Sequence, residues 1–208
     1  VKVTTVLNQA GLPVPCPLRD YNGTAIQQIQ DKPALLFPKV KGRHPHIADA
    51  AKCAAIGDVM ARMHIASAAI SETFEGCRSP RWVLDWAPKI ISQVDVAAAK
   101  LMQQEITALL GLIGQSAALP QGVIHNDLFR DNALFDGDVL TGIIDFYNAG
   151  RGMLLMDVAI AVNDWCATND GEVSKPLATA LLAAYARVRP FTEPEHQHWP
   201  AMLRAAAR

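Results

Sequence analysis

Four polar side chains of types that could do chemistry lie in one short stretch of the chain, residues 123–146. They are His125, Asp127, Asn132 and Asp145. Each follows or separates short apolar runs of the kind that form buried strands. A polar loop held between two such strands fixes its side chains around one point, so we expect these groups to lie close together.

The order of these groups matches the needs of phosphoryl transfer. One carboxylate accepts the proton of an attacking hydroxyl, while an amide oxygen and a second carboxylate hold Mg2+ against nucleotide phosphates. We therefore predict that Asp127 is the catalytic base, that Asn132 and Asp145 bind Mg2+, and that His125 supports the loop. Taken singly, such an Asp or Asn more often caps a turn, and only the ordered set indicates chemistry.

A turn signal at Asp136-Gly137-Asp138 would bring the two metal ligands together. Asp-Gly tolerates the positive φ that tight hairpin turns require. The strand that ends at Asp145 would then fold back beside the strand that follows Asn132. We expect both side chains at the same end of this hairpin.

The pattern H-x-D-x-x-x-x-N, followed by two hydrophobic residues and Asp, resembles the catalytic loop and metal-binding Asp of the kinase fold. Residues 145–147 read Asp-Phe-Tyr and so depart from the Asp-Phe-Gly of protein kinases, as is usual in the aminoglycoside and choline kinase-like family. Within that family, HNDLFRDNALFDGDVLTGIIDFYNAG looks most like the bacterial homoserine kinases. The resemblance covers essentially the whole chain and implies ATP and Mg2+ as cofactors. It also implies phosphorylation of the side-chain hydroxyl of L-homoserine, a step towards threonine. The scattered cysteines separately favour reduced thiols in a cytoplasmic protein.

The resemblance further implies an α+β, protein-kinase-like fold with two lobes. Residues 1–41 are similar to the latter part of the small nucleotide-binding lobe and its hinge, and residues 42–208 to the helical large lobe with its catalytic loop. By position alone, the hinge that binds the nucleotide falls at Phe37, Lys39 and Val40.

Local patterns in the first part of the chain predict a helix over residues 1–10 that stops at Gly11. Asn22-Gly23 predicts a hairpin tip, and the apolar run 34–37 a strand. No Gly-rich phosphate loop and no convincing strand lysine occurs in this part, so we expect both to precede Val1 in the full protein.

Apolar periodicity predicts several helices in the second part of the chain. They cover residues 47–69, 80–90 (opened by Ser79-Pro80), 96–113, 153–167 and 176–188, with a last helix opened by the capping box of Thr192 and Glu195. Leu101, Ile106, Leu109 and Ile113 should face inward. Trp82 and Trp86 share one helix face; we expect core packing, with a substrate site as the alternative.

Two titratable residues inside these helices need partners. Asp157 lies in the apolar helix 153–167, and an unpaired buried carboxylate is costly. The resemblance implies that Asp157 braces the catalytic loop from behind. His64, near the end of helix 47–69, is more simply a structural histidine satisfied by a backbone carbonyl than a functional one.

Residues 147–152 read as a flexible loop at which a substrate pocket could form. An amino-acid zwitterion needs a cation for its carboxylate and an acceptor for its ammonium group. We nominate Arg130 and Arg151 for the carboxylate, because the guanidinium fork bonds both oxygens. Asn163 or Asp164 would receive the ammonium group. A surface salt bridge is the alternative for Arg130.

The composition of the chain narrows the classes of function that remain. The net charge of −1 gives no basic excess for nucleic acid or for a membrane surface. The four cysteines are scattered without metal-site spacing, and no stretch approaches the roughly 20 apolar residues of a membrane span. No signal peptide opens the chain. The rival readings are another small-molecule kinase of the family (choline, aminoglycoside or sugar) and a catalytically inactive kinase-fold binding module. A metal-dependent hydrolase using His125 and Asp127 is more remote.

Overall fold

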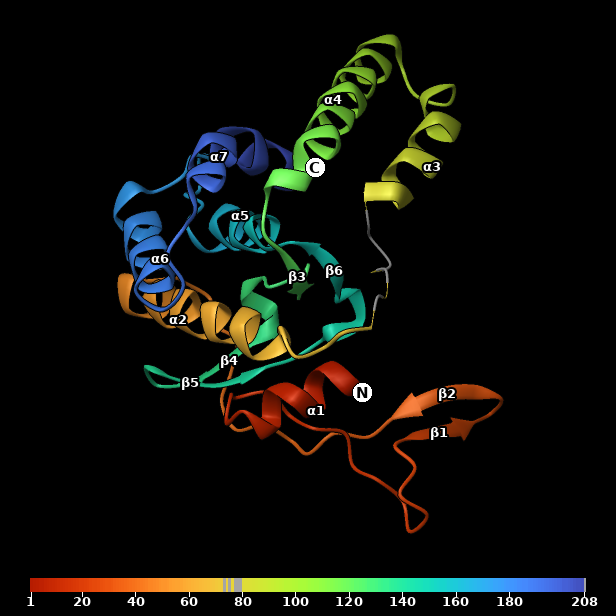
Figure 1. Ribbon diagram of the computed structural model, residues 1–208, viewed down its shortest axis with the longest axis vertical. Coiled ribbons are helices and arrows are strands. Elements are labelled where there is room, and N and C mark those ends of the chain that lie inside the picture. The colour runs from red at the N-terminus through yellow and green to blue at the C-terminus, as the bar shows by residue number, and fades with distance from the viewer. Residues whose placement is uncertain (73, 75, 77–79, 208) are drawn as a thin grey trace.

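The computed structural model describes residues 1–72, 74, 76 and 80–207 (Figure 1). Its helices are α1 (Lys2–Gln9), α2 (Ala50–Ser67), α3 (Pro80–Ile91), α4 (Val96–Gln115), α5 (Leu154–Trp165), α6 (Lys175–Val188) and α7 (Glu193–Ala206). Its strands are β1 (Ile26–Ile29), β2 (Lys32–Leu35), β3 (Gln121–Ile124), β4 (Ala133–Asp136), β5 (Val139–Ile143) and β6 (Gly150–Met153). Short 3-10 turns cover Ser116–Ala118 (η1), Arg130–Asn132 (η2) and Phe146–Asn148 (η3).

The strands form three separate antiparallel pairs: β1–β2, β3–β6 and β4–β5. In Figure 1 the β1–β2 hairpin extends from one side of the molecule, and the α3–α4 pair extends from another. Helices α2 and α5 pack against β3, and α1 lies against α2 on the side of the β4–β5 hairpin. This mixture of helices and small β hairpins agrees with the α+β prediction.

The first part of the chain follows the prediction at α1 and departs from it at the hairpin. The backbone φ of Gly11 is +75°, so this residue ends the helix as expected. The tip of the β1–β2 hairpin, however, is Gln30-Asp31, both with positive φ, and the prediction of a tip at Asn22-Gly23 was wrong. Those two residues instead form a separate turn, in which the Asp20 carboxylate accepts two backbone N–H groups. The strand expected at 34–37 also lies earlier, at β2.

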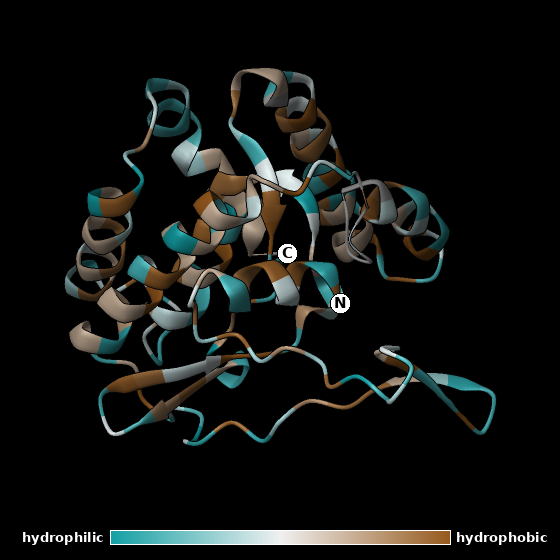
Figure 2. Ribbon diagram, turned by 60° about the horizontal axis from the view of Figure 1, so that its bottom comes forward, coloured by the Kyte–Doolittle hydropathy of each residue, from teal (hydrophilic) through white to brown (hydrophobic). Residues whose placement is uncertain are grey.

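The core of the second part is built around α2, α5 and α6. Helix α5 is buried along nearly its whole length, as its all-round apolar sequence predicts. Where α2 crosses α6, a Cβ added to Gly57 would lie 2.1 Å from the backbone oxygen of Leu181. Only a residue without a side chain permits this approach. Figure 2 shows hydrophobic residues concentrated on these central elements, while the tip of the β1–β2 hairpin is hydrophilic.

The stretch 147–152 is not the flexible loop that we expected. It begins with the end of turn η3 and continues as β6, which pairs with β3 in the register Ile124↔Gly150 to Gln121↔Met153. The pairing partner lies about thirty residues away in sequence, so no local pattern reveals it. Residues 150–153 form a strand because they pair with the backbone of β3. The result is the two-stranded sheet β3–β6, in which β3 leads directly into the catalytic loop.

The α3–α4 pair is more exposed than predicted. Helix α3 begins at Pro80 as expected; the predicted cap residue Ser79 lies outside the described residues. The rings of Trp82 and Trp86 lie tilted against each other, with centroids 6.5 Å apart, but the two residues are 47% and 48% exposed and do not belong to the core. Leu101 is 57% exposed, whereas Leu109 is buried as predicted.

Helix α4 also departs from a second expectation. Within the described part of the chain it is the one helix long and apolar enough to cross a membrane by length and composition alone, and we had expected none. It nevertheless carries Lys100 and Glu105, and Glu105 forms an ion pair with Arg204 of α7.

Candidate active site

The backbone of the catalytic loop is held by one buried carboxylate. Asp157 on α5 is fully buried and accepts hydrogen bonds from the backbone N–H of His125 (2.8 Å) and of Asn126 (2.7 Å). Burial opposes ionisation, yet the hydrogen bond from His64 and the loop N–H groups hold the pKa of Asp157 below its usual value. The prediction that Asp157 is paired is confirmed.

His64 provides the other side of this anchor. Its Nε2 lies 3.1 Å from Oδ2 of Asp157, and its Nδ1 lies 2.8 Å from the hydroxyl of Tyr185 on α6. The expected partner, a backbone carbonyl, was wrong. Burial raises the pKa of Tyr185, so its hydroxyl remains protonated. His64 therefore lies behind the catalytic loop as part of a buried side-chain network.

His125 connects the catalytic loop to the segment that precedes Asp145. Its Nε2 donates to the carbonyl oxygen of Ile144 (2.9 Å), and its ring packs against Phe146 with centroids 4.5 Å apart. Among the described residues its buried Nδ1 has no hydrogen-bond partner. The His125 ring is therefore occupied by contacts within the protein, which fits the predicted role of supporting the catalytic loop.

The two candidate metal ligands lie at the same end of the β4–β5 hairpin, as predicted. Gly137 takes the positive φ that the turn requires, and Ala133 pairs with Ile143. One residue further on, the N–H of Ile144 donates to the carbonyl oxygen of Asn132 (3.0 Å). Asp145 follows with a left-handed backbone (φ 62°), an unfavourable conformation that tends to occur at functional sites.

Asp127 is linked directly to one of the two candidate ligands, Asn132. The side-chain Nδ2 of Asn132 donates to the backbone oxygen of Asp127 (2.7 Å) and approaches its Oδ2 (3.4 Å). Since the nitrogen of Asn132 is engaged, its side-chain oxygen is the atom suited to a cation. Asn148 also donates to Oδ2 of Asp127, at 3.0 Å. Sequence reasoning missed Asn148, whose one signal is its place three residues after Asp145.

The donor set fits Mg2+. An amide oxygen and an exposed carboxylate are hard oxygen ligands, and Mg2+ characteristically takes few protein ligands together with water and phosphate oxygens. In the described ranges, no group of three or more His, Cys, Asp or Glu side chains could hold a metal ion. A site that needs the nucleotide to complete its coordination is consistent with both observations.

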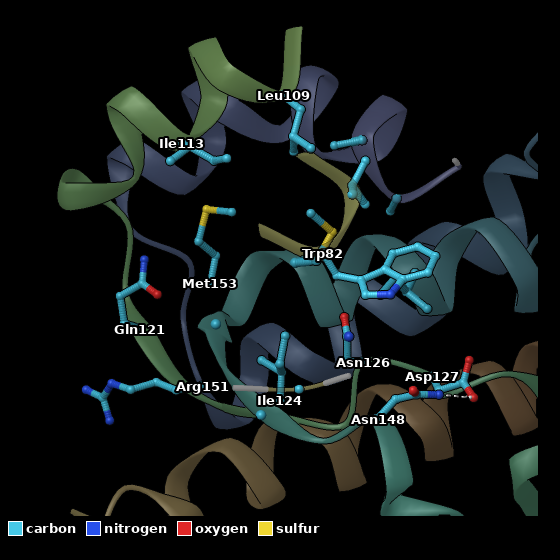
Figure 3. Close-up of a pocket in the computed structure, with 18 of the residues that line it drawn as sticks. Trp82, Leu109, Ile113, Gln121, Ile124, Asn126, Asp127, Asn148, Arg151 and Met153 are labelled. Carbon is cyan, nitrogen blue, oxygen red and sulfur yellow. Dashed lines mark hydrogen bonds between the residues drawn. The ribbon is translucent and has the colours of Figure 1, made fainter. Parts of the chain in front are cut away.

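A cavity of about 460 Å³ opens beside Asp127 (Figure 3). Its polar end is formed by Asn126, Asp127 and Asn148, and Trp82 of α3 lies over it, so the alternative of a pocket role for this tryptophan is the one that the structure favours. Most of the remaining wall is apolar and comes from α3, α4, α5, β6 and α7: Val83, Leu84, Leu109, Ile113, Met153, Met156, Ile160, Ala205 and Ala206.

The four nominated substrate-binding residues occupy different places. Arg151 lines the cavity, although Figure 3 shows its guanidinium pointing outward at the end opposite Asp127. Arg130 and Asp164 pair with each other, with Nε 3.3 Å from Oδ2, and Asp164 also accepts the backbone N–H of Arg130 at 2.7 Å. Asn163 donates to the carbonyl oxygen of Leu203 on α7. These last three are not among the residues that line the cavity.

The nominated hinge runs alongside the β4–β5 hairpin. A side-chain atom of Val40 lies 2.6 Å from the position that a Cβ on Gly142 would occupy, and the Thr141 hydroxyl donates to the carbonyl oxygen of Lys41. Phe37 and Lys39 are exposed. The segment is thus in contact with the hairpin that carries both candidate metal ligands.

Comparisons with known proteins agree with this geometry. The family model described as "Phosphotransferase enzyme family" matches residues 1–191. The chain is 41% identical over 206 residues to a homoserine kinase of Pseudomonas aeruginosa (strain LESB58), covering 99% of this chain and 65% of that protein. It is 40% identical over 203 residues to a homoserine kinase of Methylobacillus flagellatus, covering 98% and 63%. The chain therefore spans about 65% of the length of the first of these relatives.

Solved structures show the same fold at low identity. Amicoumacin kinase hAmiN, in complex with AMP-PNP, Ca2+ and Ami, superposes with a TM-score of 0.73 at 16% identity, covering 97% of this chain and 64% of that one. A microcompartment-associated aminopropanol kinase gives a TM-score of 0.66 at 17% identity, covering 99% and 68%. The predicted kinase-like fold is confirmed.

Proposed function

Because this chain belongs to the phosphotransferase enzyme family, we propose that the protein containing it transfers the γ-phosphate of ATP to the side-chain hydroxyl of L-homoserine. The observation that carries the proposal is the direct linkage of Asp127 to Asn132, at the hairpin end that also bears Asp145. The acceptor is supported by the homoserine kinases that are about 40% identical to nearly the whole chain.

In the proposed reaction the homoserine hydroxyl lies against the carboxylate of Asp127. The hydroxyl oxygen attacks the γ-phosphorus, its proton passes to Asp127, and the bond between the γ-phosphorus and the bridging oxygen breaks to release ADP. When bound by Asn132 and Asp145, Mg2+ would neutralise charge on the phosphate oxygens. Solvent then removes the proton from Asp127 and restores the base.

The substrate carboxylate requires a cation that can reach the cavity. We propose Arg151 for this role, because it lines the cavity and its side chain is exposed. Arg130 and Asp164 neutralise each other beside the loop, so we propose that this pair holds the loop. Asn163, which is bonded to Leu203, would fasten α7 to α5.

We also propose that residues 1–41 belong to the small lobe and residues 42–208 to the large lobe, with ATP bound between them. The contact between Val40 and Gly142 supports a hinge at Phe37, Lys39 and Val40. A cytoplasmic location fits the free thiols of Cys53 and Cys166.

The test is an acceptor panel with the full-length protein. ADP release is measured with L-homoserine, L-serine, choline and kanamycin, and the Asp127→Asn variant supplies the background. We expect the highest kcat/KM for homoserine, since the shorter side chain of serine does not reach the base from the same carboxylate contact. Turnover of choline or kanamycin at an equal or higher kcat/KM would refute the acceptor and leave the kinase reaction standing. Nucleotide binding with no turnover of any acceptor would favour an inactive binding module.

One observation favours a second candidate, a small-molecule kinase with a bulkier acceptor. The cavity of about 460 Å³ is larger than a molecule as small as homoserine requires, and most of its wall is apolar. Kanamycin and choline in the same panel test this alternative.

A further inference from the structure

We propose that Asn148 is a positioning residue for the catalytic base. Its side-chain amide fixes the orientation of the Asp127 carboxylate. It also joins this base to the η3 turn, which directly follows the candidate metal ligand Asp145. The inference rests on the proposed function, because it assigns Asn148 a task in the same phosphoryl transfer.

The first observation is the hydrogen bond itself. Nδ2 of Asn148 lies 3.0 Å from Oδ2 of Asp127, and Asn148 is only 6% exposed. The amide of Asn132 approaches the same oxygen at 3.4 Å. A single carboxylate oxygen of Asp127 thus receives two amide donors, one from the η2 turn and one from the η3 turn. Rotation of the carboxylate would break both contacts, so together they select one orientation.

The second observation is that Asn148 itself is held firmly. It ends the η3 turn, which the N–H of Ala149 closes onto the carbonyl oxygen of Phe146. A Cβ at Gly76 would lie 2.5 Å from the carbonyl oxygen of Asn148, so Gly76 lies directly against this residue. Phe146 of the same turn packs on His125. The amide therefore projects from a braced backbone; Figure 3 shows it beside Asp127 at the polar end of the cavity.

The third observation concerns connectivity. Asn148 follows Asp145 by three residues in the same turn, and the Asp145 side chain accepts the N–H of Tyr147 at 3.4 Å. The base and one metal ligand are therefore joined by a single short segment. A carboxylate beside a divalent cation tends to bind it. We infer that the donor from Asn148 keeps Asp127 turned towards the acceptor hydroxyl and away from the cation.

This inference separates catalysis from binding. Loss of the amide should lower kcat, while the affinities for nucleotide and acceptor should change little. Two variants of the full-length protein test it: Asn148→Leu removes the donor at similar size, and Asn148→Asp adds a like charge. The matched control is Asn8→Leu, which removes an amide donor to the carbonyl oxygen of Val14 (2.9 Å) at a residue that does not line the cavity.

We expect kcat to fall about 10- to 100-fold in Asn148→Leu, a large part of what a general base contributes, and further in Asn148→Asp. The dissociation constant for a non-hydrolysable ATP analogue with Mn2+, measured by calorimetry, should stay within about twofold of the wild-type value. The control should keep wild-type kcat. A kcat for Asn148→Leu within threefold of wild type, or a parallel loss of nucleotide affinity and thermal stability, would overturn the proposal.

A crystal structure of the Asn148→Leu variant gives a readout that requires no knowledge of the acceptor. We expect the Asp127 carboxylate to leave the orientation in which Oδ2 meets Asn132. An unchanged Asp127 rotamer would overturn the inference. If homoserine is not the acceptor, the wild-type protein shows no turnover of it, while the crystallographic comparison still decides the role of Asn148.

Discussion

The Nε2 atom of His64 lies 3.1 Å from Oδ2 of Asp157, and both side chains are almost completely buried. The same Asp157 carboxylate binds the backbone N–H groups of His125 and Asn126. The orientation of the catalytic loop therefore depends on a charged group inside the core, four residues into α5. This contact is stabilising only while each group keeps its partners.

Removal of this carboxylate should destabilise the protein strongly. Asp157→Ala leaves two loop N–H groups and His64 without an acceptor, and removal of one partner from a buried charged pair typically costs about 3–5 kcal/mol. Urea denaturation of the variant and the wild type measures the difference. A loss below about 1 kcal/mol, the scale of an exposed pair, would contradict the buried network.

The same carboxylate predicts a dependence of stability on pH. The folded-state pKa of Asp157 lies below its ordinary value of 3.8. Its contribution is therefore fully present above that ordinary value and is lost as the pH falls through the lower folded-state pKa. We expect the free energy of unfolding to fall more steeply below pH 4 in the wild type than in Asp157→Asn, measured by urea titration at each pH. Equal slopes would contradict the assignment.

The proposed catalytic base, Asp127, has a direct test. Asp127→Ala in the full-length protein should lower kcat about 10²–10⁴-fold with little change in ATP affinity, since a base acts on the acceptor proton. Asp138→Ala, at the exposed hairpin tip, is the control that should retain activity. Near-normal turnover of Asp127→Ala would remove this residue from the mechanism.

The proposed metal ligands predict a change in cation binding that is measurable without turnover. Asp145→Asn removes the charged ligand and should abolish tight binding of Mn2+ with a non-hydrolysable ATP analogue, and Asn132→Ala should weaken it. Calorimetry gives both affinities, and activity titrated against Mg2+ provides the second readout. Unchanged cation affinity in both variants would refute the site.

The crossing of α2 and α6 gives a prediction about stability alone. Gly57→Ala places a methyl group 2.1 Å from the backbone oxygen of Leu181, so the helices must separate. Overpacking of this kind costs about 1–3 kcal/mol. Gly111→Ala on α4 meets nothing within 4 Å and should instead be stabilising by up to about 1 kcal/mol, because alanine favours the helix. Thermal denaturation distinguishes the two variants by the sign of the change.

Substrate recognition is tested by conservative substitutions of the two arginines. Arg151→Lys should raise the KM for homoserine and leave that for ATP unchanged, because lysine cannot form the paired contact with a carboxylate. Arg130→Lys should weaken the pair with Asp164 and lower stability, with a smaller effect on KM. A raised homoserine KM only in Arg130→Lys would return the substrate role to Arg130.

The sequence alone determined the features that depend on local patterns. The Asp-Gly turn at 136–137 placed Asn132 and Asp145 at one end of a hairpin, since such a turn folds the second strand back beside the first; the register shift between Leu134 and Phe135 had no such local signal. The capping box of Thr192 and Glu195 opens α7 as predicted, because both of its hydrogen bonds are made within four residues. The order of His125, Asp127 and Asn132, which lie within eight positions of one another, indicated phosphoryl transfer because it too is a local pattern.

The tertiary structure alone decided the contacts between distant segments. The bond from Asn148 to Asp127, the pairing of β6 with β3 and the contact of His64 with Asp157 all join residues more than twenty positions apart. No periodicity or turn signal in one segment specifies a partner in another, because such contacts arise only when helices and strands pack. Packing likewise exposed Trp82, which helical spacing had assigned to the core, and set it over the cavity beside Asp127.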